Sequence, residues 1–196
     1  TANMLVDIGG GTAEIAIISM AGTVTSKSLR VAGDHLNNDI IRFVRDEFRL
    51  IIGEPTAEEL KINIGSAMPL EEKVEMSIQG RDIATGLPKE VIIRDSQIRA
   101  AIGRSLKTII EAVREVLEIA PPELAGDILR RGAYLCGGGS LLRNLNELIA
   151  QELSIAVHVV DDPLTCVVRG TGIAIENFEK YSPILSHPMI PKNIRV

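Results

Sequence analysis

Two glycine triplets, each directly after a short apolar segment, constrain this fold more than any other feature of the sequence. The first apolar segment, residues 4–8, ends at glycines 9–11, and the second, residues 133–136, ends at glycines 137–139. Glycine has no Cβ, so backbone N–H groups in such loops can approach an anion closely. Either triplet alone is equally compatible with a tight turn that binds nothing. Two such units in one chain favour two loops that meet around one ligand, such as a nucleotide.

The region around the first triplet is predicted to form an antiparallel meander followed by a helix. Residues 4–8, 13–19 and 23–31 are rich in β-branched side chains or alternate in polarity, which is typical of strands. After residue 33 the apolar side chains recur at helical spacing, and Asp34 is a candidate N-cap. We therefore expect three strands and then a helix.

The middle of the chain is predicted to contain a second helix and two more strands. The helix covers about residues 55–65, because Thr56 and Glu59 have the spacing of a capping box. Residues 74–79 alternate in polarity and residues 91–93 are apolar and β-branched, which indicates strands.

The remaining elements alternate between helices and strands. A long amphipathic helix is expected over about 96–119, where a pair of prolines ends it, and a short helix over 122–131. After the second triplet we expect a helix, and Ser140 is its candidate N-cap if this loop is only a strand-to-helix turn. A last strand over 157–160 and a final helix over 165–178 complete the pattern.

Composition excludes several classes of function. Lys and Arg total 21 against 26 Asp and Glu, a formal charge of −5, so the chain lacks the basic excess of a nucleic-acid-binding protein. No apolar run approaches the roughly 18 to 20 residues of a membrane-spanning helix. Cys136 and Cys166 have no CxxC spacing, which argues against a zinc site or disulfide framework and favours a reducing cytosol.

Five segments, in this order and spacing, resemble one family. They are Val6–Thr12 (VDIGGGT), residues 56–61 (TAEELK), 80–88 (GRDIATGLP), 135–142 (LCGGGSLL) and 162–172 (DPLTCVVRGTG). Together they resemble the MreB/Mbl family of bacterial actins, within the superfamily of actin, Hsp70 and sugar kinases, over about residues 3–178. The first triplet is similar to the second phosphate loop of that superfamily, and the second triplet to its adenosine loop.

The resemblance implies a set of nucleotide-site residues, with ATP and Mg²⁺ as cofactors. Phosphate contacts are implied for Gly10, Gly11 and Thr12, a water-mediated Mg²⁺ contact for Asp7, and adenosine contacts for Glu58, Glu59, Lys61, Gly138, Gly139, Ser140 and Leu141. From the residues alone, the capping box is the better explanation of Glu59, and a solvated helix surface is the better explanation of Lys61. Both explanations stay open at this point.

The resemblance also implies a domain organisation, that of the family's C-terminal half. The fold is then α/β, an RNase H-like (actin-like ATPase) subdomain IIA of residues 1–32 and 102–178 with a smaller α+β subdomain IIB, residues 33–101, inserted into it. An extended tail is expected over 179–196, where three prolines recur. The other phosphate loop and the water-activating carboxylate belong to the family's other half, so no catalytic residue is implied here.

The function implied is that of an ATP-binding protein that polymerises into cytoskeletal filaments and controls bacterial cell shape and wall synthesis. Its partners are further copies of itself and shape-complex proteins such as RodZ, not nucleic acid, and membrane contact is made through the other half. The family hydrolyses ATP slowly, in the cytoplasm and at the inner face of the membrane when assembled, and this half alone is expected to be inactive. The alternatives are a sugar-kinase-like phosphotransferase and an Hsp70-like chaperone ATPase.

Overall fold

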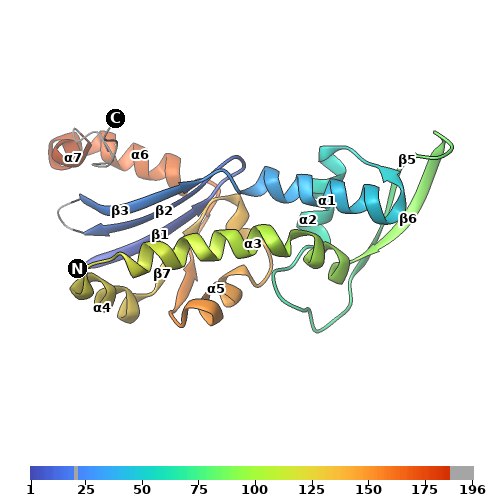
Figure 1. Cartoon of the computed structure of the whole chain (residues 1–196). Coiled ribbons are helices and arrows are strands. Elements are labelled where there is room, and N and C mark those ends of the chain that lie inside the picture. Colours follow the sequence, from blue (N-terminus) through green and yellow to red (C-terminus); the bar gives the residue numbers. More distant parts are fainter. Residues whose placement is uncertain (20–21, 186–196) are drawn as a thin grey trace, which may run out of the picture.

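The computed structural model describes residues 1–19 and 22–185, which form two β-sheets at opposite ends of an elongated molecule (Figure 1). The larger sheet has the order β3-β2-β1-β7-β8 and the smaller one the order β4-β5-β6. The larger sheet consists of β1 (Ala2–Ile8), β2 (Ala13–Ser19), β3 (Gly22–Leu29), β7 (Ala133–Cys136) and β8 (Val157–Val159). The smaller sheet consists of β4 (Leu50–Ile51), β5 (Glu75–Asp82) and β6 (Pro88–Arg94). The predicted mixed α/β class is confirmed.

Period-two burial explains the larger sheet. Every second side chain is buried along β1 and from Ala13 to Ile17 of β2, as the alternation in their sequences predicts. Strands β1, β2 and β3 pair antiparallel, which confirms the predicted meander, whereas β7 pairs parallel to β1 with Val6 opposite Leu135. Because the carboxyl ends of parallel strands meet at one edge, both glycine triplets lie at the same edge of the sheet.

One long helix, α3 (Asp95–Glu118), connects the two ends of the molecule (Figure 1). Its buried stripe includes Ile98, Ile102 and Ile109, at the spacing of one helix face, and it packs against both β2 and β6. The predicted helix is confirmed. The expected subdomain boundary between residues 101 and 102 falls inside this helix, and the division into two subdomains stays a prediction.

Helix α1 (Gly33–Phe48) and helix α2 (Glu54–Ile64) pack against each other, and the beginnings of both differ from the sequence prediction. Asp34 is not the N-cap of α1, because the helix begins one residue earlier and Ala32 is its N-cap. The capping box of Thr56 and Glu59 is also wrong. Helix α2 begins at Glu54, since proline is well tolerated in the first turn, where its missing N–H has no intrahelical partner.

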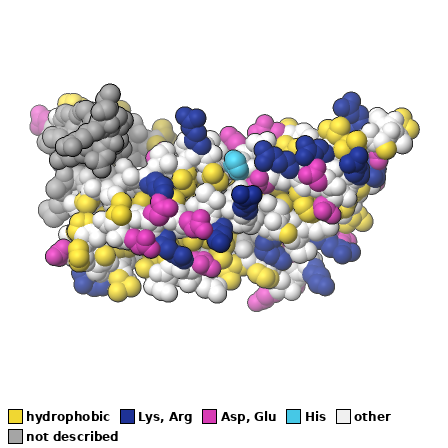
Figure 2. Space-filling view, viewed as in Figure 1, with side chains coloured by type: hydrophobic (Ala, Val, Ile, Leu, Met, Phe, Trp, Pro, Cys, Tyr) yellow, Lys and Arg dark blue, Asp and Glu magenta, His cyan; other side chains and the backbone are white. Residues whose placement is uncertain are grey.

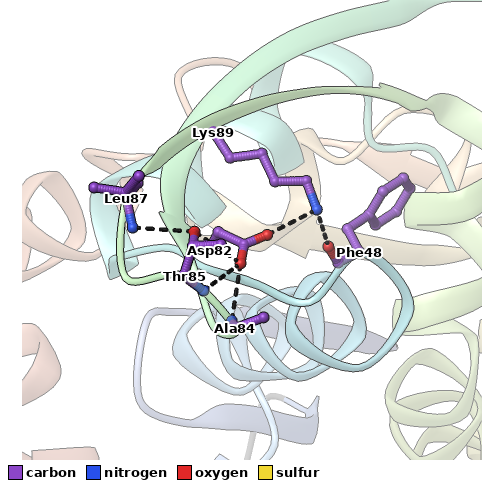
Figure 3. A network of polar contacts seen from close by, with 6 residues as sticks. All are labelled: Phe48, Asp82, Ala84, Thr85, Leu87 and Lys89. Atoms are coloured by element: carbon purple, nitrogen blue, oxygen red, sulfur yellow. Dashed lines mark hydrogen bonds and ion pairs between the residues drawn. The ribbon is translucent and has the colours of Figure 1, made fainter.

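The β5–β6 hairpin is held by one carboxylate (Figure 3). Asp82 accepts hydrogen bonds from the backbone amides of Ala84 and Thr85 at 2.8 and 2.9 Å, and Lys89 lies 3.1 Å from its other oxygen. The Lys89 ammonium also donates to the carbonyl of Phe48 at 3.1 Å, which ties the hairpin to the end of α1. The bond from the Thr85 amide and the nearby Lys89 lower the pKa of Asp82 to about 2.

The segment after β7 is more broken than predicted. Glycines 137–139 lead into a short 3₁₀ helix, η1 (Gly138–Leu141), and α5 (Leu145–Leu153) begins only after Asn144, which has a left-handed φ of 60°. Ser140 is not an N-cap, because its hydroxyl donates to the carbonyl of Gly137 at 2.7 Å within the 3₁₀ turn.

The remaining helices are α4 (Pro122–Arg131), α6 (Cys166–Glu176) and α7 (Phe178–Leu185). The expected extended tail is wrong for residues 179–185, which belong to α7. The amides of Lys180 and Tyr181 donate to the carbonyl of Asn177, so a helical turn is established before Pro183 is reached. The rest of the expected tail, residues 186–196, lies outside the described residues.

Among the described residues, no helix combines the length and the apolar character that crossing a bilayer requires. On the face shown in Figure 2, acidic and basic side chains lie among one another.

Candidate functional site

A cavity of about 320 Å³ lies where the two glycine triplets approach α1 and α2. Its wall combines five separate chain segments: the β1–β2 loop, the start of α1, one face of α2, the loop after β7 and the turn before α6. The charged side chains in the wall are Asp34, Glu58, Lys61 and Arg143. The large apolar side chains are Leu36, Ile62, Leu141, Leu142 and Leu164. Such a mixture of apolar walls and few charged groups is typical of small-molecule sites.

The first triplet is held in place through hydrogen bonds to its carbonyl groups, and two of its amide groups have no hydrogen-bond acceptor in the part of the chain that the structure describes. The carbonyls of Gly9 and Gly10 accept hydrogen bonds from the first amides of α1, Gly33 at 3.0 Å and Asp34 at 2.8 Å. These bonds satisfy donors that a helix end otherwise leaves unpaired. Among the described residues, the amides of Gly10 and Gly11 have no acceptor. The loop can therefore offer two backbone donors to an anion.

The second triplet is anchored to the turn before α6. Gly137 has a φ of 78° and its amide donates to the carbonyl of Pro163 at 3.0 Å. Its own carbonyl accepts from the amide of Ser140 at 3.1 Å, which closes the 3₁₀ turn. The amides of Gly138 and Gly139 have no acceptor in the described part of the chain. This loop also presents two free donors.

A compact charged cluster forms one wall of the cavity. The Lys61 ammonium donates to Glu58 Oε2 at 2.7 Å and to the carbonyl of Gly33 at 3.3 Å, and Asn37 donates to the same Glu58 oxygen at 2.6 Å. Burial by itself would raise the pKa of Glu58, but the hydrogen bonds from Lys61 and Asn37 bring it below its ordinary value. Glu58 is therefore an anion at neutral pH.

Asp7 lies near this cavity but does not line it. It is half-buried at the end of β1, opposite Cys136, and an added Cβ on Gly137 would lie 2.4 Å from Asp7 Oδ1. Burial, and then the charge of Asp7, raise the pKa of the Cys136 thiol to about 12. Cys136 and Cys166 are free thiols, and the described residues contain no group of three or more His, Cys, Asp or Glu suited to a metal. A single carboxylate still fits Mg²⁺, which keeps several of its waters.

The cavity gathers some of the predicted site residues and not others. Those that line it are Gly10, Glu58, Lys61, Gly138, Gly139 and Leu141. Those that do not are Asp7, Gly11, Thr12, Glu59 and Ser140. Gly11, Thr12 and Glu59 are exposed, and Ser140 is buried with its hydroxyl bonded internally.

Several wall residues were missed by the sequence prediction. The position of Asp34 at the start of a predicted helix marks it as a polar residue with a role, but the sequence pattern predicts an N-cap rather than a cavity residue. Its carboxylate instead faces the first triplet, 3.2 Å from where a Cβ on Gly10 would lie. Leu164 lies in one of the five segments that resemble the family, but no role is implied for it there, and Arg143 lies outside those segments; only the fold brings both to the cavity.

Comparison with solved structures identifies the fold. The crystal structure of MreB5 of Spiroplasma citri bound to AMPPNP aligns with 92% of this chain and 54% of its own, at 41% identity and a TM-score of 0.88. A structure of the MamK double helical filament shares the fold at 23% identity and a TM-score of 0.75, over 89% of this chain and 54% of its own. The fold is therefore that of the actin-like ATPases.

Sequence relatives identify the family. The model of the family described as MreB/Mbl protein matches residues 1–183. The cell shape-determining protein Mbl of Bacillus subtilis (strain 168) is 43% identical over 178 residues, 91% of this chain and 54% of that protein. The cell shape-determining protein MreB of Escherichia coli (strain K12) is 47% identical over 181 residues, 92% and 52% respectively. The chain belongs to the MreB/Mbl family, which confirms the resemblance found in the sequence. It spans about half the length of these relatives.

Proposed function

We propose that this chain forms the nucleotide-binding part of an actin-like protein that assembles into filaments and determines cell shape. One observation carries the proposal: both glycine triplets meet α1 and α2 around one cavity, in a chain 41% identical to an MreB5 bound to AMPPNP. The curated relatives are named cell shape-determining proteins, which supports the cellular role. The sugar-kinase and chaperone alternatives have no comparable support.

The chemistry of the wall suggests how ATP lies in it. Phosphates fit the free amides of Gly10 and Gly11, since backbone donors bind oxyanions without a counter-charge. The nucleoside fits between the Glu58–Lys61 side and the apolar surface near Leu141. Mg²⁺ would be held by Asp7 through water and would neutralise phosphate charge. Self-association, contact with RodZ, and a cytoplasmic location at the membrane face belong to the same proposal through the family.

Calorimetric titration of the 196-residue chain with Mg-ATP tests the binding step. The expected dissociation constant is weaker than about 1 µM, a binding free energy smaller in magnitude than about 8 kcal/mol, because the family's other phosphate loop is not part of this chain. Adenosine and inorganic triphosphate are separate probes for the two parts of the cavity. The absence of any heat with ATP at millimolar concentration would contradict the proposal.

Sedimentation of the full-length protein tests the assembly step. Polymer that pellets with Mg-ATP and not with buffer alone is the expected result. Transfer of the γ-phosphoryl group of ATP to a sugar hydroxyl, followed by mass spectrometry, is the corresponding assay for the sugar-kinase alternative. A phosphorylated acceptor without polymer would overturn the filament assignment.

A further inference from the structure

Asn37 of α1 is a buried polar residue beside the cavity. Asn37 is only 2% exposed, and its Nδ2 donates a hydrogen bond to Glu58 Oε2 at 2.6 Å. Its Oδ1 is buried and has no hydrogen-bond partner among the described residues. A buried acceptor without a partner costs free energy, so an amide here is a poor choice for stability alone.

Asn37 and Lys61 act on the same oxygen of Glu58. The Lys61 ammonium lies 2.7 Å from Oε2, and its side chain is only 13% exposed. Two donors at 2.6 and 2.7 Å satisfy Oε2 and restrain its position. Glu58 Oε1 has no partner in the described chain, and the residue lines the cavity. One oxygen is thus anchored and the other is left available.

We infer that Asn37 is a positioning residue of the nucleotide site, which holds Glu58 so that its free oxygen accepts a hydrogen bond from the bound nucleoside. This inference rests on the proposed nucleotide binding. The donor on the nucleoside is a ribose hydroxyl or the amino group of adenine, since these are the groups that a carboxylate recognises. Asn37 itself does not line the cavity, so it would act through Glu58.

The neutral amide matters because the wall is already charged. The charged groups that face Glu58 or share its cavity are Lys61 on α2, Asp34 at the start of α1 and Arg143 in the loop after β7. A carboxylate at position 37 would have the shape of the amide, but at neutral pH it would repel Glu58 where Asn37 now donates. At lower pH the two carboxyl groups would share a proton, and a donor would be restored.

Three variants of the full-length protein test the role of Asn37. Asn37→Leu removes the donor at similar volume and should lower ATP affinity about tenfold, the effect of losing a hydrogen bond to a charged group. Its melting temperature should be unchanged or higher, since the unpaired oxygen is removed as well. Asn38→Leu is the matched control: Asn38 is the next residue of α1, is exposed, and bonds only to the carbonyl of Asp34 in its own helix. The control should bind ATP normally.

Asn37→Asp supplies a readout that a merely structural role would not move. Its ATP affinity should be lower than that of Asn37→Leu at pH 7.5 and should recover relative to wild type as the pH falls to 5.5. The relative affinity of Asn37→Leu should not change over this range. If Asn37→Leu proves unstable, the pH dependence of Asn37→Asp alone decides: a flat relative affinity overturns the inference.

Nucleotide analogues identify the donor. The titrations are repeated with 2′-deoxy-ATP, 3′-deoxy-ATP and purine riboside triphosphate, which lacks the 6-amino group. The analogue that lacks the contacted group should bind wild type and Asn37→Leu about equally. An equal loss with ATP and all three analogues would show that no nucleoside donor is involved. Normal ATP binding by Asn37→Leu overturns this inference only, whereas wild-type protein that fails to bind ATP overturns the proposed function and this inference with it.

Discussion

The two glycine triplets look alike in the sequence but differ in what surrounds them. In the first, an added Cβ on Gly11 would meet no atom within 4 Å, and the nearest atom to one on Gly10 would be in the Asp34 carboxyl group, at 3.2 Å. In the second, an added Cβ on Gly137 would lie 2.4 Å from the backbone oxygen of Ile8, and one on Gly139 would lie 2.3 Å from the Ile8 side chain. The first triplet is open, whereas the second is packed against β1.

Glycine is therefore needed in the two triplets for two different physical reasons. In the second triplet, Gly137 and Gly139 let the loop after β7 pack directly on the end of β1, which aligns the two loops at one sheet edge. In the first triplet the backbone and side chains stay farther away: an added Cβ would lie no closer than 3.2 Å to another atom at Gly9 or Gly10, and at Gly11 the space is unfilled by the described residues. Only Gly138 of the second triplet resembles the first, since its Cβ would meet just Leu164, at 3.2 Å. Packing and ligand approach can therefore be tested at separate positions.

The largest effect is expected for Gly139→Ala. The methyl group would overlap the Cγ2 and Cβ atoms of Ile8, which is 1% exposed and cannot move aside. We expect a loss of about 2 to 3 kcal/mol in the free energy of unfolding, typical of overpacking a tight core. Urea denaturation measures it, with Gly170→Ala in α6 as control, where nothing lies within 4 Å. A variant as stable as wild type would show that the second triplet is not packed as described.

The sequence predicts the features that depend on interactions between neighbouring residues, and it misses those that depend on contacts between distant segments of the chain. Alternation and helical spacing are local, and they correctly predicted β1, β2 and the long helix α3. The 3₁₀ turn after β7 was missed because it depends on the left-handed Asn144 and on anchorage to Pro163. The cavity wall was only partly predicted, since its remaining residues come together through the fold.

A second prediction concerns binding at Gly138. Gly138→Val should lower ATP affinity at least tenfold, about 1.4 kcal/mol, because the side chain would fill space at the cavity wall. Stability should change little, since the one atom in its way belongs to Leu164, which is 69% exposed. Titration with Mg-ATP and a thermal melt measure both quantities. The double variant Gly138→Val with Leu164→Ala is the control, because it removes the protein contact: recovered affinity would mean that Leu164, and not the ligand, was displaced.

Gly11→Ala should increase the free energy of unfolding, whereas Gly139→Ala should decrease it. Position 11 is open and its φ is not positive, so alanine costs no strain and restricts the unfolded chain. The expected gain is about 0.4 to 1 kcal/mol in the free energy of unfolding. ATP affinity should fall several-fold, since the methyl group would lie where we propose that phosphate oxygens approach the Gly11 amide. A loss of stability would place Gly11 with the packed glycines and remove the contrast between the two triplets.

The smallest change in stability is expected at Asp7, the residue where the two triplets approach each other. If its carboxylate anchored the glycine turn, Asp7→Asn would weaken hydrogen bonds to the backbone and cost about 1 to 3 kcal/mol. Among the described residues, however, no backbone amide donates to Asp7, whose side chain instead lies against Gly137 and Cys136. Asp7→Asn keeps this shape and removes only the charge, so the free energy of unfolding of the nucleotide-free protein should change by less than about 0.5 kcal/mol.

Mg²⁺ should reveal what the charge of Asp7 does. In the full-length protein, the gain in ATP affinity on adding Mg²⁺ should shrink in Asp7→Asn, whereas ATP affinity in EDTA should be equal to that of wild type or higher, because a negative charge near the phosphates is gone. Titrations with and without Mg²⁺, paired with thermal melts, separate a metal role from an anchoring role. A destabilised variant that keeps the full Mg²⁺ effect would show that Asp7 serves the packing of the second triplet. Another carboxylate would then have to hold the metal beside the first triplet, and the carboxylate nearest to Gly10 is that of Asp34.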